Sequence, residues 1–327
     1  MRYSIRKIVC GILVASLTIG ATGCSEKKEE PKKTVQVEKA AAVSDGELKA
    51  DSVVVGVGGT KVLYQEYQAY DWFLRNQYEG LMTADVWNYN LGETTVGQLA
   101  VEDCLRLIIQ IKVLNKAAAE QGIALAVDEK EDIDYKADQY LATIPPEVQQ
   151  ANGITTEMMH IIFEENEIAR KMYDVVTGNV EATIDEAAMQ AAKVLLYKEP
   201  ANDSNREEVR AKVNTLVAEK ANYTGNFYSF IKDKTGTAPE EVIIGKMDGR
   251  VNLVNTALTM ERHSISGVIE EKDGFYVIQC LKSNTKALNK NYREQYIAEQ
   301  QSSAFQAAYE NYAEKYEVKV SKSLLAK

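Results

Sequence analysis

The chain has 327 residues, with 38 Lys and Arg against 48 Asp and Glu, and its formal net charge is −10 at pH 7. This acidic balance disfavours a nucleic-acid partner, which would need a basic face. Only two histidines are present; His160 shares a helix face with Glu164, but one histidine and one acid do not define a zinc site. No glycine-rich dinucleotide motif is complete. We therefore expect no metal and no cofactor.

The first residues are typical of a secretory signal. Basic residues within the first seven precede an apolar run over residues 8–23, which is shorter than the roughly 20 residues that cross a bilayer as a helix. The sequence ATGC at residues 21–24 resembles the lipobox of bacterial lipoproteins, although leucine is more usual at the position of Ala21. The resemblance implies cleavage before Cys24 and a lipid on its sulfur, hence a lipid anchor on the extracytoplasmic face of the cell membrane. An uncleaved anchor helix is the alternative.

Residues 24–50 are predicted to be a flexible tether, because they are charged, poor in aromatics and without periodicity. Removal of the signal and lipidation of Cys24 would leave Cys104 and Cys280. Both lie in apolar patterns far apart in the sequence, so we interpret them as small buried residues and not as a disulfide.

The region that follows the tether is predicted to be mostly helical. It opens with a strand over residues 51–63 that is interrupted by a Gly58-Gly59 turn. One helix begins at a capping box formed by Thr95 and Gln98 and stops near Gly122. With the other apolar patterns, the predicted helices cover residues 64–82, 95–122, 128–143 and 155–177.

After about residue 190 the patterns change to those of a compact α+β module. The predicted strands cover residues 191–197, 240–247, 266–271 and 274–282. Short helices are predicted over residues 205–220, 226–234 and 252–260, and a turn at Lys272-Asp273 joins the last two strands. A long helix over residues 289–315 and a strand-like tail, KYEVKVSKSLL, end the chain.

In its order of elements the mature chain resembles PrsA/SurA-type foldases. VVVGVGGTKVLYQEYQAY is similar to their opening, AAAEQGIALAVDEKEDI to a helix end within their lobe, and the tail to their returning C-terminal segment. The stretch 191–282 resembles a parvulin, a peptidyl-prolyl isomerase. The resemblance implies an α+β fold with a helical chaperone lobe and an inserted domain that has a four-stranded antiparallel sheet. Its implied parts are a signal peptide (1–23), a tether (24–50), the N-terminal lobe (51–187), the parvulin-like domain (188–283) and a completing C-terminal segment (284–327).

The resemblance also implies where a parvulin site would lie. Such sites use two facing histidines, a nearby Asp or Cys, and a Met/Phe pocket for the proline ring. Position by position, the two histidines fall on Lys193 and Tyr276, so both imidazoles are replaced. The remaining candidates are Asp233 and Tyr276 for catalysis and Met247, Leu253 and Phe275 for substrate binding. Each has an ordinary alternative: Asp233 as a helix-end residue, Tyr276 as a packing residue. We therefore expect weak isomerase activity or none.

These observations favour a membrane-anchored extracytoplasmic foldase or chaperone. Its implied partners are unfolded or nascent secreted polypeptides and, through Cys24, the membrane, with a homodimer left open. Five apolar residues of the 155–177 helix are candidates for a client-binding surface, although core packing is their more ordinary role: Met158, Met159, Phe163, Met172 and Tyr173. An active isomerase and a non-catalytic assembly lipoprotein are the alternatives.

Overall fold

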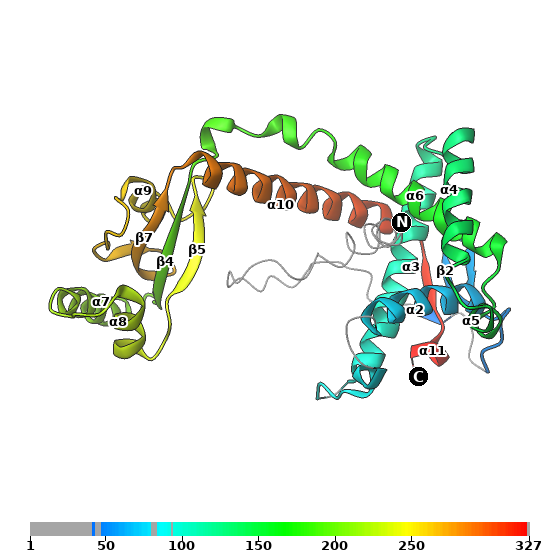
Figure 1. The fold of residues 1–327 in the computed structure, drawn as a ribbon, viewed down its shortest axis with the longest axis horizontal. Helices are drawn as coiled ribbons and strands as arrows, with labels where there is room; N and C mark the ends of the chain where they lie inside the picture. The colour runs from blue at the N-terminus through cyan, green and yellow to red at the C-terminus, as the bar shows by residue number, and fades with distance from the viewer. Residues whose placement is uncertain (1–40, 43–46, 80–83, 93, 326–327) are drawn as a thin grey trace. The chain divides into compact units, whose positions relative to one another are not determined.

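The computed structural model describes residues 41–42, 47–79, 84–92 and 94–325 (Figure 1). The predicted signal, Cys24 and most of the tether lie outside the described residues. The chain divides into two compact units. Unit 1 contains the described residues up to Gly178 together with those from Ser302 onward, and unit 2 contains Asn179–Gln301. Among the described residues, no helix combines the length and the apolarity that crossing a membrane requires.

Unit 1 places helices around a small mixed sheet. Its sheet has the order β1-β8-β2-β3, in which β8 pairs antiparallel with β2 and parallel with β1. Residues 318–320 therefore pair with residues 41–42 and 55–57 in one sheet, although they are far apart in the sequence. The elements are β1 (Ala41–Ala42), β2 (Val53–Val57), β3 (Thr60–Leu63), α2 (Tyr64–Glu79), the 3₁₀ helix η3 (Ala84–Asn88), α3 (Val96–Glu120), α4 (Val127–Leu141), α5 (Pro146–Asn152), α6 (Thr156–Thr177), β8 (Val318–Val320) and α11 (Lys322–Leu325).

Local chemistry explains several of these boundaries. Gly58 and Gly59 both have positive φ, at 51° and 90°, and form the turn between β2 and β3. The predicted capping box is present: the Thr95 hydroxyl accepts from the Gln98 N–H at 3.2 Å, and the Gln98 side chain accepts from the Thr95 N–H at 2.9 Å. The short helix α5 was not predicted, although a proline at its first turn and the left-handed Gly153 after its last residue are the usual signals for one.

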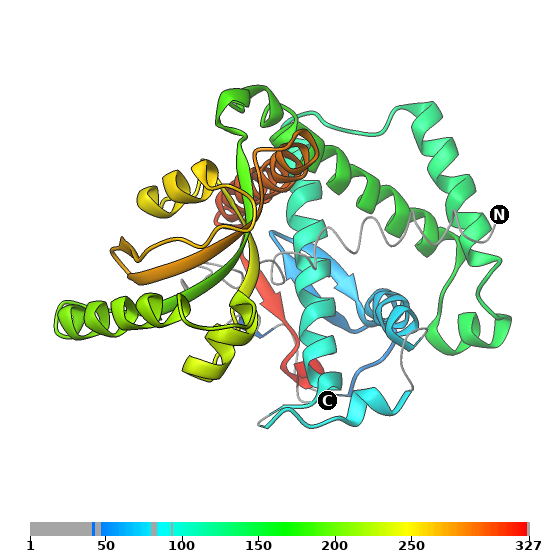
Figure 2. The ribbon, with the colours of Figure 1, turned by 60° about the vertical axis from the view of Figure 1, so that its left-hand side comes forward.

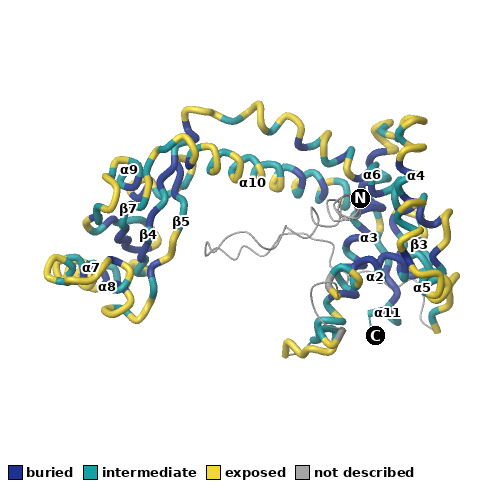
Figure 3. The backbone as a smooth tube through the Cα atoms, in the orientation of Figure 1, coloured by how far each residue is buried: buried dark blue, intermediate teal, exposed yellow. Residues whose placement is uncertain are grey.

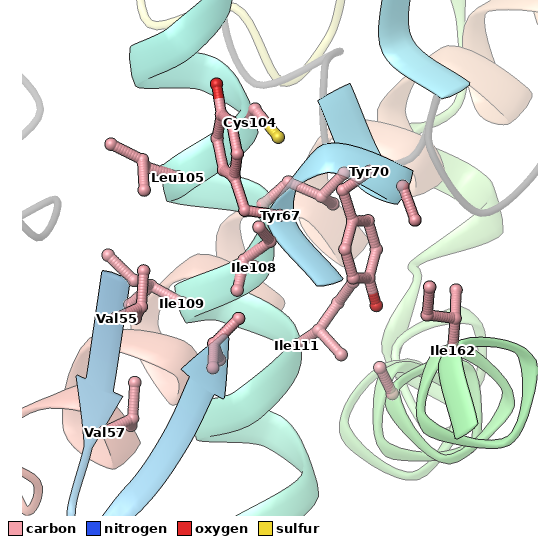
Figure 4. Close-up of a cluster of buried hydrophobic side chains, with 14 of the residues drawn as sticks. Val55, Val57, Tyr67, Tyr70, Cys104, Leu105, Ile108, Ile109, Ile111 and Ile162 are labelled. Atoms are coloured by element: carbon pink, nitrogen blue, oxygen red, sulfur yellow. The ribbon is translucent and has the colours of Figure 1, made fainter. Parts of the chain in front are cut away.

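The core of unit 1 forms where α3 packs against α2, α6 and the sheet (Figure 4). Cys104 and Ile108 of α3 are fully buried there, and in Figure 3 the buried residues gather along α2 and α3. Met159 and Met172 of α6 have no exposed surface. Met158 is also buried, and Phe163 and Tyr173 are partly buried against the same cluster. All five candidates for a client surface thus contribute to the core, the more ordinary of their two predicted roles.

Unit 2 confirms the predicted α+β class. Its four strands are all antiparallel, in the order β5-β4-β7-β6. The long helix α10 (Lys286–Ala313) begins in unit 2 and ends in unit 1. The other elements are the 3₁₀ helices η4 (Glu181–Thr183) and η5 (Glu186–Ala188), β4 (Ala191–Pro200), α7 (Arg206–Lys220), α8 (Phe227–Thr235), β5 (Glu240–Gly245), α9 (Val251–Thr259), β6 (Ile269–Glu271) and β7 (Gly274–Ser283).

Helix α9 lies on one face of the sheet of unit 2 and helices α7 and α8 lie on the other (Figure 2), and each face has its own apolar cluster. We call one the α9 face, where side chains such as Val194 and Ile278 pack with Leu253 and Val254 of that helix. We call the other the α7–α8 face, where Tyr197 and Val277 pack with those two helices. Cys280, like Cys104, is buried and free, which confirms the interpretation of both as packing residues.

Candidate functional site

The strand register separates the two positions where parvulin histidines are expected. β4 pairs with β5 without a shift, so its successive side chains point to opposite faces. Val194 belongs to the α9 face, and the neighbouring Lys193 therefore points to the α7–α8 face, where its ammonium lies 2.5 Å from a carboxylate oxygen of Glu241. Tyr276 lies on the α9 face. The structure therefore does not bring Lys193 and Tyr276 together.

Asp233 also lies apart from Tyr276. It is on α8, whose apolar side chains pack on the α7–α8 face, and its exposed carboxylate accepts a hydrogen bond from the Tyr223 hydroxyl. This bond raises the pKa of Tyr223. The sheet itself stands between Asp233 and Tyr276, so these two candidate catalytic groups do not face a common substrate.

The three candidate substrate-binding residues do not share a surface either. Leu253 and Phe275 are both fully buried, Leu253 on the α9 face and Phe275 on the α7–α8 face. Met247 follows β5 and is 48% exposed. Of the predicted site residues, only Leu253 and Tyr276 belong to one cluster.

A polar network that sequence reasoning missed surrounds Tyr276. The Tyr276 cluster comprises Lys198, Asp248, Arg250, Asp273 and Tyr276. The Tyr276 hydroxyl donates to Asp273 Oδ2 at 2.7 Å, and the Lys198 ammonium lies 3.1 Å from the same oxygen. The Arg250 guanidinium lies 5.4 Å from the centre of the Tyr276 ring and donates to both carboxylate oxygens of Asp248, at 2.9 and 2.5 Å.

The charges in this cluster hold Tyr276 as a neutral donor. Burial raises the pKa of Tyr276, and its hydrogen bond to Asp273 raises it further, while Arg250 and Lys198 act in the opposite direction without reversing the shift. Burial tends to raise the pKa of Asp273, but the bonds from Tyr276 and Lys198 outweigh it and lower that pKa. The proton of the phenol is therefore directed to Asp273 and not toward a bound peptide.

Access to this cluster is limited as well. Tyr276 and Leu253 each have 0% of their surface exposed, so a proline ring could contact neither without displacing α9. Only cross-strand register could have revealed the cluster, because Lys198 is the partner of Tyr276 across β4 and β7. Among the described residues no three His, Cys, Asp or Glu side chains gather as metal ligands.

Comparison with known proteins gives the following relationships. No protein-family model matches the chain, and no curated protein matches it. Solved structures of PrsA and SurA-like proteins are among those that match. A SurA-like chaperone of Campylobacter jejuni is 13% identical over 82% of this chain and 99% of its own, with a TM-score of 0.31.

Two PrsA structures are comparable. PrsA of Bacillus anthracis is 14% identical, covering 62% of this chain and 96% of its own, with a TM-score of 0.33. PrsA of Bacillus cereus is 13% identical, covering 85% and 96%, with a TM-score of 0.32. These proteins are of the type that the sequence resembles. At such low identity and similarity, the function of this chain has to be argued from its own residues.

Proposed function

We propose that this protein is a membrane-anchored extracytoplasmic chaperone that holds unfolded secreted polypeptides, with a parvulin-like domain of weak or no isomerase activity. On this proposal residues 51–187 and 284–327 form the holding lobe, residues 188–283 the parvulin-like domain, and Cys24 carries the lipid. The lipobox-like start and the element order of the sequence support it.

Weak or absent isomerase activity is proposed because the candidate catalytic side chains lie apart from one another. Rotation about a prolyl bond is opposed by amide resonance, with a barrier of about 20 kcal/mol. An enzyme lowers it by gripping the proline and offering hydrogen bonds that favour the twisted amide. Here Lys193 and Asp233 lie on one side of a sheet, and Tyr276 is buried on the other with its hydroxyl bound to Asp273. Within the described part of the chain, these three side chains therefore do not line one pocket that could offer both the grip and the hydrogen bonds.

The holding surface would have to come from exposed apolar side chains, because the methionines of α6 are in the core. Helices α4 and α6 pack on each other, and the His160 ring nitrogen lies 2.8 Å from an Asp138 oxygen between them. Together these helices expose four large apolar side chains: Val127, Tyr135, Ile161 and Val175. We assign them as contacts for unfolded chains.

An aggregation assay tests the chaperone proposal. The chain without residues 1–24 should slow the aggregation of a chemically denatured client in proportion to its concentration. Tyr135→Ser with Ile161→Ser should weaken this effect, whereas Met247→Ser, an exposed apolar residue outside these helices, should leave it unchanged. If client aggregation is unaltered at every molar excess, the proposal is wrong.

Two further measurements separate the alternatives. A proline-peptide isomerisation assay should give the uncatalysed rate; a faster rate that Asp233→Ala removes would favour the enzyme. A pull-down should return many unfolded chains, and a single stable partner would favour an assembly lipoprotein. Mass spectrometry of the mature protein should find a lipid on Cys24 as the first residue, and an uncleaved N-terminus or an unmodified Cys24 would contradict the lipid anchor.

A further inference from the structure

Unit 2 contains an apolar cavity on the sheet face opposite the Tyr276 cluster. Its volume is about 160 Å³, and it lies where α7 and α8 cover the sheet (Figure 2). The residues that line it are Leu216, Val217, Lys220, Ala221, Phe227, Phe230, Ile231, Ile265, Ser266 and Val277. The sheet separates it from Tyr276, and none of the candidate parvulin-site residues Asp233, Met247, Leu253, Phe275 and Tyr276 lines it.

The side chains that line the cavity are mostly apolar and buried, and the hydroxyl of Ser266 has its hydrogen bonds satisfied. Phe227, Phe230 and Ile231 of α8 are essentially fully buried, and Val277 of β7 is 2% exposed. The Ser266 hydroxyl is already bonded, accepting from the Ile278 N–H at 3.0 Å and donating to a backbone carbonyl at 2.7 Å. Protein interiors are normally close-packed. An apolar space of about 150 Å³ is large enough for a molecule the size of benzene.

One cation borders this cavity without an acidic partner. The Lys220 ammonium lies 5.7 Å from the centre of the Phe230 ring and 5.8 Å from that of Tyr223, and its hydrogen bond to the Gly225 carbonyl is long, at 3.5 Å. Within the described part of the chain, no carboxylate lies within ion-pair distance of Lys220. The adjacent Glu219 is instead paired with Lys234 at 2.7 Å. In a chain with more acids than bases, this leaves the ammonium free to meet an external anion.

We infer that the cavity binds an apolar group of about the size of a phenyl ring that carries a carboxylate, with the ring inside and the carboxylate at Lys220. This inference rests on the proposed function for the identity of its natural ligand. That ligand is a large apolar side chain of an unfolded client with an acidic group next to it. The site would give unit 2 a role in client binding that needs no catalytic group.

Three fragments that differ only in their head group test the site. These are 3-phenylpropionate, 3-phenylpropan-1-ol and 3-phenylpropylamine, titrated into the chain without residues 1–24 and followed by the methyl NMR signals of Ile231 and Val277. The carboxylate should bind about two- to fivefold more tightly than the alcohol, the range expected for an exposed ion pair, and the amine should bind most weakly. If none of the three shifts these methyl signals, the site does not exist.

Substitutions in the protein separate the binding of the phenyl ring in the cavity from the interaction of the carboxylate with Lys220. Lys220→Gln should make the carboxylate and the alcohol bind equally, whereas the matched control Lys232→Gln, an exposed lysine of α8 outside the lining, should preserve the difference. Ile265→Trp should fill the cavity and abolish binding of all three fragments, with unchanged amide NMR signals of β4 and β5 showing that unit 2 remains folded. If the preference for the carboxylate persists in Lys220→Gln, the assigned role of Lys220 is wrong.

A separate measurement tests whether an unfolded client is the natural ligand of the cavity. In the aggregation assay Ile265→Trp should suppress client aggregation less than the unsubstituted chain does. Fragment binding combined with full suppression by Ile265→Trp would overturn the client as ligand and leave the chaperone proposal standing. Failure of the unsubstituted chain to suppress aggregation would overturn the chaperone proposal and the client assignment together, whatever the fragments do.

Discussion

The most demanding test of the fold concerns a buried lysine in unit 1. The Lys112 ammonium, on α3, lies 2.7 Å from a carboxylate oxygen of Glu66 on α2 and 2.6 Å from one of Glu165 on α6. The three side chains are only 5%, 16% and 20% exposed. One cation therefore joins three helices and contacts two carboxylates, whose combined charge it balances only by half.

Substitution of Lys112 by Met should remove that cation and leave both carboxylates buried. Breaking a buried ion pair from one side costs about 3–5 kcal/mol of unfolding free energy, because the remaining charge is uncompensated. Both tryptophans, Trp72 and Trp87, lie in unit 1, so urea unfolding followed by tryptophan fluorescence reports this unit alone.

The loss of unfolding free energy in Lys112→Met should also depend on pH. Burial, aided by the negative charge of Glu66, raises the pKa of Glu165 although Lys112 lowers it. A carboxyl with a raised pKa binds its proton more tightly in the folded state, so its contribution to stability is greatest below its unfolded pKa of about 4.3 and falls as the pH rises through the folded pKa. Without Lys112 the pKa of Glu165 should rise further. Lys112→Met should therefore regain part of its stability as the pH falls from about 7 to about 5.

Two control experiments test whether the loss of stability comes from the uncompensated buried carboxylates. Lys136→Met removes a lysine whose partner on α4, Asp132, is 60% exposed, and it should cost less than about 1 kcal/mol. Adding Glu66→Gln and Glu165→Gln to Lys112→Met removes the stranded charges and should recover part of the loss. A cost below about 1 kcal/mol for Lys112→Met, or no recovery in the triple variant, would refute the reasoning.

Three further predictions concern unit 2. Arg250→Met should lower the protection of β7 amides from hydrogen exchange by about 1 kcal/mol at pH 7. Burial tends to raise the pKa of Asp248, but bonds from Arg250 lower it, so this difference should vanish as the pH falls through that lowered pKa; an unchanged difference in acid would contradict the assignment. Lys193→His with Tyr276→His should give no prolyl isomerisation, because the two side chains lie on opposite faces of the sheet, and a tenfold gain in rate would show otherwise. Gly274→Ala should lower the protection of β4 and β7 amides from hydrogen exchange by about 2 kcal/mol, because its φ is +146° and a Cβ would lie 2.4 Å from a backbone oxygen of β4; unchanged protection would count against this strain.

Much of the element order could be read from the sequence, because it depends on interactions between near neighbours. The capping box at Thr95 and the glycine turn at Gly58 act within a few residues of themselves. Helical spacing of apolar residues likewise placed α3 and α6 within a few residues of their observed bounds. Buried, free cysteines followed from the apolar patterns around Cys104 and Cys280.

Tertiary structure alone decided which groups meet. Strand side chains alternate between faces, so pairing across strands determines that Lys193 and Tyr276 are separated and that Lys198 and Asp273 approach the phenol. The insertion of β8 between β1 and β2, and the cavity beside Lys220, likewise join segments distant along the chain. Local sequence patterns do not predict these long-range contacts, because the contacts form only when the helices and strands pack together.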